Sequence, residues 1–251
     1  MQIFLKIWYI ITMQNKKQPN FLSRPTVIEA SFDLRCDFSQ PVEVVAVELF
    51  KKYAACALNG LERLPTNEIP ELIRQADPNL QNAPLYQIRV GSANIQIGRF
   101  GVRYVQQTSY PGWDSLHNKL KEFLETIFNA NIVIQLKRVG IRYINFLIAD
   151  AANVCKISFN SGMNFRRKQF NHTDVFEKDD FTIKTVIANQ AKLNNKIDGS
   201  LLDIDISCNK SQSPDFKEID SQVEMLHSMC RDVFFSSLSE DFLNSLEPKY
   251  E

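Results

Sequence analysis

The strongest constraint in the chain is an alternation of apolar and polar residues over Val27–Phe38. Successive side chains of a β-strand point to opposite faces, so this pattern predicts a strand with one buried face. The residues on the buried side are Ile28, Ala30, Phe32, Leu34, Cys36 and Phe38. The intervening residues are all polar, which leaves the other face of the strand for solvent or for charged partners.

The first 150 residues carry further strand and helix signals. A helix is expected after Pro41, ending near Asn59-Gly60, and a second one begins at Trp113 or Asp114, where apolar residues recur at helical spacing. The predicted strands are Leu85–Val90, Asn94–Gln107 and Ile132–Ile148. With Val27–Phe38, this gives the β-α-β-β-α-β order of a ferredoxin-like unit.

The rest of the chain adds a further antiparallel strand set. Strands are expected over Val154–Phe159, Phe181–Gln190 and Leu201–Cys208, with residues 160–179 as an exposed loop. Apolar residues from Ile219 to Phe234 then form the stripe of a long C-terminal helix. We therefore expect an α+β fold in which this helix packs on the extended sheet.

The domain organisation follows from these elements. Residues 22–251 are predicted to form a single α+β domain, with subdomains 22–150 and 151–251 as the alternative. Residues 1–21 read as an N-terminal tail, in which an apolar run ends before Met13. That run is too short to span a bilayer, so Met13 is predicted as the true start, with an amphipathic membrane foot as the alternative.

Composition excludes several classes of protein. The 29 basic and 29 acidic residues give a net charge of zero, which argues against nucleic-acid binding by bulk charge. The five cysteines contain no CxxC spacing, so zinc and redox motifs are unsupported and a cytoplasmic location is expected. No cofactor is predicted, because the phosphate-binding, zinc and nucleophile motifs are missing from the sequence.

Two similar motifs point to an anion. Arg99-Phe100-Gly101-Val102-Arg103-Tyr104 closely parallels Arg138-Val139-Gly140-Ile141-Arg142-Tyr143. On regular strands each motif would place two guanidinium groups on one face, about 13 Å apart, on either side of a bare glycine. Guanidinium binds phosphate and carboxylate groups with two hydrogen bonds, so the candidate anion-binding residues are Arg99, Arg103, Arg138, Arg142 and Tyr143.

The competing interpretation is structural. Asp203 and Asp205 share one face of their strand, as do Glu29 and Asp33, and these carboxylates would neutralise the arginines as cross-strand pairs. Asp203 and Asp205 are also a weak candidate metal site, because two carboxylates hold Mg²⁺ in metal-dependent nucleases.

Candidate contacts with a partner or a nucleic acid are Trp113, Arg166, Arg167 and Lys168. Trp113 lies next to a Pro-Gly turn and could form a platform for a base, or simply fix the start of the following helix. The basic residues are alternatively a solvated loop. His227 follows Glu224 by three residues, which favours a solvated pair on a helix surface.

These motifs also carry a resemblance. The strand Val27–Leu34, the turn Tyr110-Pro111-Gly112-Trp113, the segments Arg138–Asn145 and Leu201–Asp205, and Leu226-His227 resemble a sporadically distributed family of uncharacterised prokaryotic proteins. The Tyr-x-Gly-Trp and Arg-x-Gly-x-Arg-Tyr-x-Asn motifs are its most specific parts, and the match covers residues 22–247. The resemblance implies no activity and supports Met13 as the start.

We therefore expect a non-enzymatic cytoplasmic binding or interaction module that recognises a protein partner, encoded in the same operon, or an anionic ligand. The alternative is an RNA- or nucleotide-directed protein, such as a metal-dependent nuclease. No membrane span is expected, and the sequence leaves both the oligomeric state and the question of enzymatic activity open.

Overall fold

The strand predicted at Val27–Phe38 lies at the centre of a large antiparallel sheet. The computed structural model describes residues 18–107, 110–156 and 168–250. In these residues nine strands pair in the order β3-β4-β5-β6-β2-β7-β10-β9-β8, and β1 pairs separately with β11. The strands are β1 (Phe21–Leu22), β2 (Val27–Phe38), β3 (Glu62–Arg63), β4 (Pro84–Val90), β5 (Ala93–Gly98), β6 (Gly101–Gln107), β7 (Val133–Leu147), β8 (Asn171–Lys178), β9 (Phe181–Leu193), β10 (Ile197–Cys208) and β11 (Pro248–Lys249).

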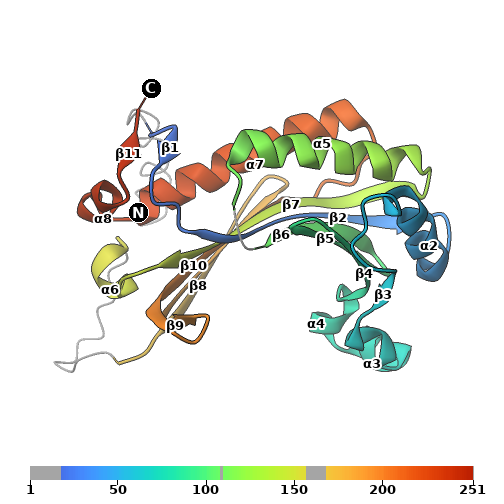
Figure 1. Ribbon diagram of the computed structural model, residues 1–251, viewed down its shortest axis with the longest axis horizontal. Coiled ribbons are helices and arrows are strands. Elements are labelled where there is room, and N and C mark those ends of the chain that lie inside the picture. Colours follow the sequence, from blue (N-terminus) through green and yellow to red (C-terminus); the bar gives the residue numbers. More distant parts are fainter. Residues whose placement is uncertain (1–17, 108–109, 157–167, 251) are drawn as a thin grey trace.

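Helices cover one face of this sheet. Figure 1 shows α5 and α7 lying along that face, and α7 contacts α5, β7 and β10. The short helices α3 and α4 lie beyond the β3–β4 edge. The helices are α2 (Val42–Tyr53), the 3-10 helix η2 (Pro65–Glu68), α3 (Glu71–Ala76), α4 (Pro78–Gln81), α5 (Trp113–Asn129), α6 (Ala151–Val154), α7 (Phe216–Ser237) and α8 (Glu240–Ser245).

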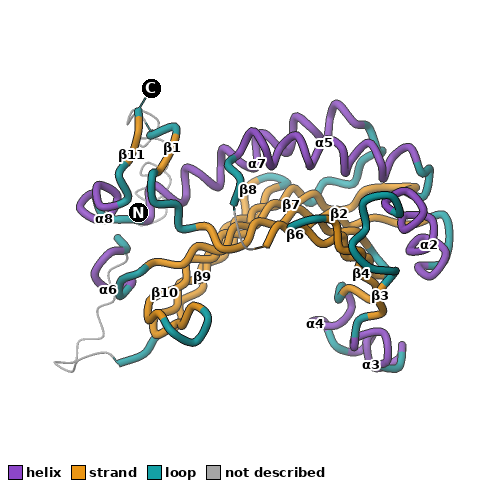
Figure 2. Tube along the Cα trace, in the orientation of Figure 1, coloured by secondary structure: helices purple, strands orange, loops and turns teal. Residues whose placement is uncertain are grey.

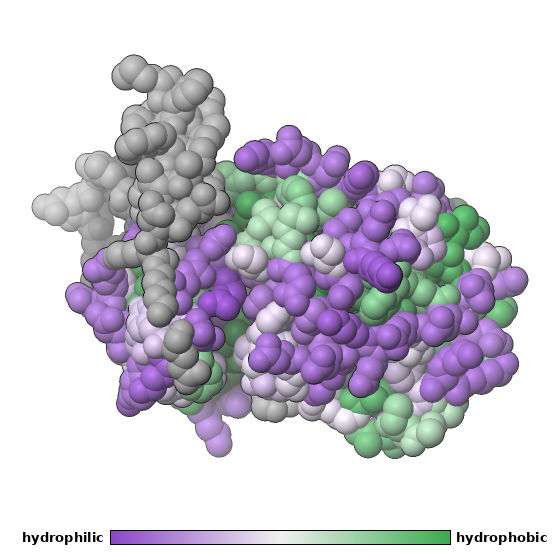
Figure 3. Space-filling model, turned by 90° about the horizontal axis from the view of Figure 1, so that it is seen from above, coloured by the Kyte–Doolittle hydropathy of each residue, from purple (hydrophilic) through white to green (hydrophobic). Residues whose placement is uncertain are grey.

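The core lies between the sheet and these helices. Phe32 of β2 meets Phe123 of α5 edge to face, with ring centroids 6.0 Å apart. The apolar stripes predicted for the two long helices are buried, from Leu116 to Ile127 in α5 and from Ile219 to Phe234 in α7. Figure 3 looks down on the helical side of the molecule, whose outer surface is mainly hydrophilic.

The expected fold class is confirmed at the coarse level. The chain is a mixed α+β structure with a mostly antiparallel sheet and a long C-terminal helix packed on it. The ferredoxin-like order of the first part is not confirmed. A split βαβ unit contains parallel neighbours, whereas β2 pairs antiparallel with both β6 and β7.

The difference arises at one turn. The expected strand Asn94–Gln107 folds back at Arg99-Phe100 and becomes β5 and β6, with Gly98 opposite Gly101. Gly101 lies so close to β2 that a Cβ atom on it would stand 2.3 Å from the carbonyl oxygen of Leu34. Glycine is therefore required where β6 meets β2, and the reversal of the chain makes this pairing antiparallel.

Two other expectations were wrong. Residues 151–154 form the short helix α6, whereas a strand was expected from Val154, and residues 157–159 lie outside the described part. The expected loop over residues 160–179 contains β8, which pairs with β9 at the edge of the sheet formed by the described residues. Both faces of β8 are largely exposed, so its sequence shows no apolar alternation to identify it as a strand.

The two parts of the chain meet in the sheet, because β7 pairs with β10 along nine residue pairs from Val139–Cys208 to Leu147–Ser200.

The two ends of the described chain lie side by side, since β1 pairs with β11, as Figure 2 shows. Residues 1–17, which include Met13, lie outside the described part. None of the helices in the described residues combines the length and the apolar character that crossing a membrane requires.

The close approach at Gly101 gives a first prediction. Gly101→Ala should lower the free energy of unfolding by about 1–3 kcal/mol, because the added methyl group overlaps the backbone of β2. Denaturant unfolding followed by circular dichroism measures this change.

Gly60→Ala is the matched control, because a Cβ atom on Gly60 meets nothing within 4 Å. We expect a change within about 0.5 kcal/mol for this variant. Equal stability of the two variants would contradict the close approach of β6 to β2.

Candidate functional site

Charged side chains gather on the face of the sheet that points away from α5 and α7. In β2, Phe32 points toward α5, so the neighbouring Asp33 points to the opposite, open face. The strand register places Asp33 opposite Gly140 and Asp205 opposite Arg142. The alternation of β2, β7 and β10 thus brings acids and arginines of three strands onto one surface.

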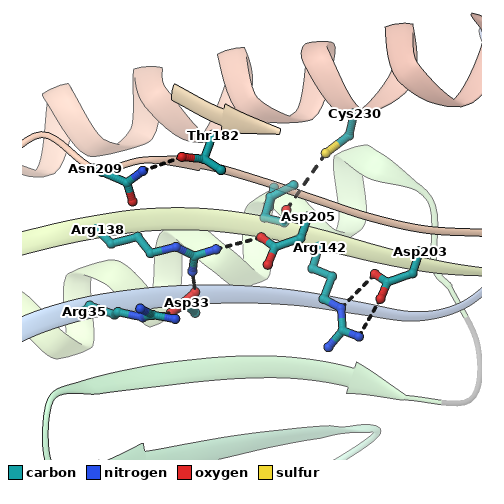
Figure 4. Close-up of polar contacts among 10 residues, drawn as sticks. Asp33, Arg35, Arg138, Arg142, Thr182, Asp203, Asp205, Asn209 and Cys230 are labelled. Atoms are coloured by element: carbon teal, nitrogen blue, oxygen red, sulfur yellow. Dashed lines mark hydrogen bonds and ion pairs between the residues drawn. The ribbon is translucent and has the colours of Figure 1, made fainter. Parts of the chain in front are cut away.

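Arg142 is held by a carboxylate in a two-bond arrangement. Its Nε and Nη2 atoms donate to the two oxygens of Asp203 at 2.8 and 2.7 Å. This fork is visible in Figure 4. The pKa of Arg142 is raised, mainly by this hydrogen bonding, so its guanidinium is fixed in the charged form.

Arg138 bridges two strands. Its Nη2 atom donates to Asp205 at 2.7 Å, and its Nη1 atom pairs with Asp33 (Figure 4). The guanidinium lies over Gly140, where a Cβ atom would stand 2.7 Å from Arg138 Nη1. Gly140 therefore marks a close approach, and the approaching group comes from its own strand.

The five candidate anion-binding residues do not lie together. Arg103, Arg138 and Arg142 share the open face. Arg99 is in the β5–β6 turn, where it pairs with Glu71, because the chain reverses there. Tyr143 points to the helical side and is buried, because it alternates with Arg142 along β7. The cross-strand ion pairs expected as the structural interpretation are present for Arg138 and Arg142.

The remaining sequence candidates are the two aspartates of the open face and a basic segment before β8. Asp203 and Asp205 share a face, and each accepts hydrogen bonds from an arginine. No group of three or more metal-ligating side chains occurs within the described ranges. Lys168 is exposed at the start of the segment before β8, and Arg166 and Arg167 lie outside the described residues.

The helical side of the sheet contains a cavity of about 330 Å³. We call it the aromatic pocket, after the residues that define it: Tyr110, Trp113, Tyr143, His227, Phe234 and Phe235. Asn145 and Arg231 also line it. Tyr110, Gly112 and Trp113 of the first motif therefore meet Tyr143 and Asn145 of the second at this pocket, together with α7. Arg142 of the second motif lies on the open face instead.

Trp113 lies between two histidines at one side of the pocket. Its ring is parallel to the His117 ring at 4.9 Å and to the His227 ring at 3.6 Å between centroids. Its Nε1 atom donates to Glu224 at 3.2 Å. Because both faces of the indole are occupied, Trp113 cannot be a stacking platform for a base, and it joins α5 to α7.

Glu224 and Asp220 of α7 hold His117. The Nδ1 atom of His117 lies 2.9 Å from Glu224, and its Nε2 atom lies 2.7 Å from Asp220. Residues four apart in sequence lie on the same side of a helix. Trp113 and His117 on α5 therefore face the same way, as do Asp220 and Glu224 on α7, so the four side chains meet between the two helices.

His227 is buried, so the sequence interpretation of a solvated pair with Glu224 was wrong. Its Nδ1 atom lies 3.0 Å from the hydroxyl of Tyr143. Burial, and then the nearby charge of Arg231, lower the pKa of His227 to about 3, so the ring is neutral. Its Nε2 atom is buried without a hydrogen-bond partner among the described residues.

Arg231 brings a positive charge to the wall of the pocket. Its Nη2 atom donates to the carbonyl oxygen of Pro19 at 2.8 Å, and its guanidinium lies 5.9 Å from the ring centroid of Phe235. No carboxylate of the described residues lies within 4 Å of it. Most of its five N–H donors are therefore available to a ligand.

Sequence reasoning missed Arg231 and the role of His227. The available signal was helical spacing, because His227, Arg231 and Phe234 recur every three or four residues on one side of α7. That spacing alone does not distinguish a ligand pocket from the core.

Comparison with known proteins identifies no related protein or family. No model of a known protein family matches the chain, and a search of curated protein sequences finds no match. The resemblance carried by the motifs therefore stays a prediction.

The buried neutral state of His227 gives a second prediction. Below pH 6.5 the unfolded chain binds a proton at this residue and the folded chain does not, until the pH reaches about 3. Stability should therefore fall as the pH drops through this window. Between pH 6.5 and 4.5 the loss due to His227 should be about 2 kcal/mol.

Denaturant unfolding of the wild type and of His227→Gln at both pH values isolates this contribution. The variant cannot titrate at this position, so its loss of stability should be smaller by that amount. Parallel pH dependences of the two proteins would contradict a buried, neutral His227.

Proposed function

We propose that the chain is a non-enzymatic binding protein whose aromatic pocket holds a small organic anion, with a carboxylate bound at Arg231 and an apolar body among the rings. One observation carries this proposal: a cavity of about 330 Å³ has mainly apolar walls and a guanidinium without a carboxylate partner among the described residues.

The size and chemistry of the pocket support a small ligand. Sites for small molecules have volumes of about 300–1,000 Å³ and combine apolar walls with a few polar groups. Here the walls are mainly aromatic and aliphatic, and the polar groups include Arg231 and the Tyr143–His227 pair. A carboxylate would satisfy the guanidinium with two short hydrogen bonds.

The protonation states favour binding over acid–base or nucleophilic chemistry. A general base works best with a pKa near the working pH, whereas the pKa of His227 is about 3. Burial raises the pKa of both the Tyr143 hydroxyl and the Cys230 thiol well above their ordinary values. The nucleophile and base candidates of the pocket are therefore held in unreactive neutral forms at neutral pH.

The alternative of a metal-dependent nuclease has less support. Its metal candidates, Asp203 and Asp205, are engaged by Arg142 and Arg138, so a metal ion would have to displace two arginines. An operon-encoded protein partner stays a prediction from the sequence.

Binding of octanoate and benzoate, measured by isothermal titration calorimetry, tests the proposal. We expect both acids to bind, and octanol, benzyl alcohol and acetate to bind at least about tenfold more weakly, because each lacks either the charge or the apolar body. Arg231→Gln should weaken octanoate binding by about 10- to 100-fold, since it removes a charge-assisted hydrogen bond.

Arg89→Gln is the matched control, because Arg89 lies at the far end of the sheet and pairs with Glu62. It should bind octanoate as the wild type does. Failure of both acids to bind, or equal binding by Arg231→Gln and the wild type, would overturn the proposed function.

A further inference from the structure

The open face of the sheet contains a second, smaller hollow of about 50 Å³. We call it the arginine hollow, and its charged residues are Asp33, Arg35, Arg103, Arg138, Arg142 and Asp205. They come from β2, β6, β7 and β10, which are neighbours in the sheet. The hollow lies across the sheet from the aromatic pocket and is independent of the proposed function.

The carboxylates of the hollow do not reach all of its arginines. Arg138 takes both Asp33 and Asp205, and Arg142 is held by Asp203 at the rim. Arg103 has no carboxylate of the described residues within 4 Å, although it lies opposite Asp33 in the strand register. One guanidinium of the hollow is therefore left without a direct carboxylate partner among the described residues.

Arg35 is incompletely satisfied as well. Its Nε atom lies 3.7 Å from Asp33, beyond hydrogen-bond distance, and this buried atom has no hydrogen-bond partner among the described residues. A buried donor without a partner is costly, so a polar group in the hollow would stabilise it. Arg35 and Arg103 thus offer donors from two adjacent strands.

The local electrostatics favour an added negative charge. Burial lowers the pKa of Arg103, and the nearby charges of Arg142 and Arg35 lower it further. Asp205 and Glu29 act in the opposite direction. Four arginines and two aspartates line the hollow, so its lining carries more positive than negative charge even with Asp203 paired to Arg142.

We infer that the arginine hollow binds a phosphate group, with Arg103 and Arg35 as its principal donors and Arg142 at its rim. Guanidinium groups match the oxygens of phosphate in charge and geometry. The hydroxyl of Ser31, which also lines the hollow, supplies a further donor. The small volume limits the bound part to a single oxyanion, either free phosphate or the terminal phosphate of a nucleotide.

Calorimetric titration with inorganic phosphate and with AMP, against chloride at equal ionic strength, tests this inference. We expect phosphate or AMP to bind, and Arg103→Gln to weaken that binding at least tenfold. Tighter binding of AMP than of phosphate would identify a nucleotide as the source, and equal binding would identify the free ion. Absence of binding by both would overturn the inference.

Arg99→Gln is the matched control, because it removes the same charge from the nearby β5–β6 turn, where Arg99 pairs with Glu71. It should bind phosphate as the wild type does. An equal loss of phosphate affinity in Arg99→Gln and Arg103→Gln would show that only the net charge matters, and it would overturn the inference.

Thermal unfolding without phosphate provides a readout that does not depend on the ligand. Arg103→Gln should unfold at a higher temperature than the wild type, because it removes an uncompensated charge next to Arg35 and Arg142. A lower unfolding temperature would show that Arg103 is a stabilising structural residue and would count against the inference. Unchanged octanoate binding by this variant would separate this site from the aromatic pocket.

Discussion

The antiparallel pairing of β7 with β2 and β10 is the interaction on which both sites depend. Side chains alternate along β7, so Arg142 points to the open face and Tyr143 points to the helices. A slip of the register by one residue would exchange the two faces and bury the arginines under α7. The core contacts of Phe32 and Ile141 therefore also fix where the charged groups lie.

This arrangement makes one strand serve two chemically opposite environments. On the helical side, Tyr143 is buried beside His227, and charge is excluded from both groups. On the open side, the carboxylates of Asp33, Asp203 and Asp205 form ion pairs with Arg138 and Arg142. Half-buried ion pairs of this kind contribute little net stability and cost much when one partner is lost. The network thus restricts which substitutions the centre of the sheet tolerates.

Local patterns were sufficient to predict much of the sheet and both long helices. The alternation in Val27–Phe38 and the stripe of α7 were each visible within a short window, since each depends on burial of one face. The turn at Arg99-Phe100 was missed, because Gly98 and Gly101 mark a contact with other strands that no local pattern encodes. The edge strand β8 was missed for the opposite reason, since neither of its faces is buried.

The candidate sites were harder to predict, because they depend on residues far apart in the sequence. Sequence spacing identified Arg103, Arg138 and Arg142 and the acids that pair with two of them. It could not identify which arginine stays unpaired, since that depends on the register of β2 against β6 and β7. The aromatic pocket was missed for a similar reason, as Trp113 meets Glu224 from 111 residues away.

The equal numbers of basic and acidic residues give no indication of either candidate site, the aromatic pocket or the arginine hollow. With 29 basic and 29 acidic residues, the composition predicts no preference for anions. The carboxylates are distributed unevenly among the arginines, however. Arg138 forms ion pairs with two of them, whereas Arg103 and Arg231 form none with the described residues. Each of these two guanidiniums lies partly shielded from water, where the effective dielectric constant is low and a single uncompensated charge acts strongly over a few ångströms. The attraction of an anion to a protein with no net charge therefore depends on how the ion pairs are distributed. On the open face the strand register determines that distribution, whereas at the aromatic pocket Arg231 is placed by its position on α7.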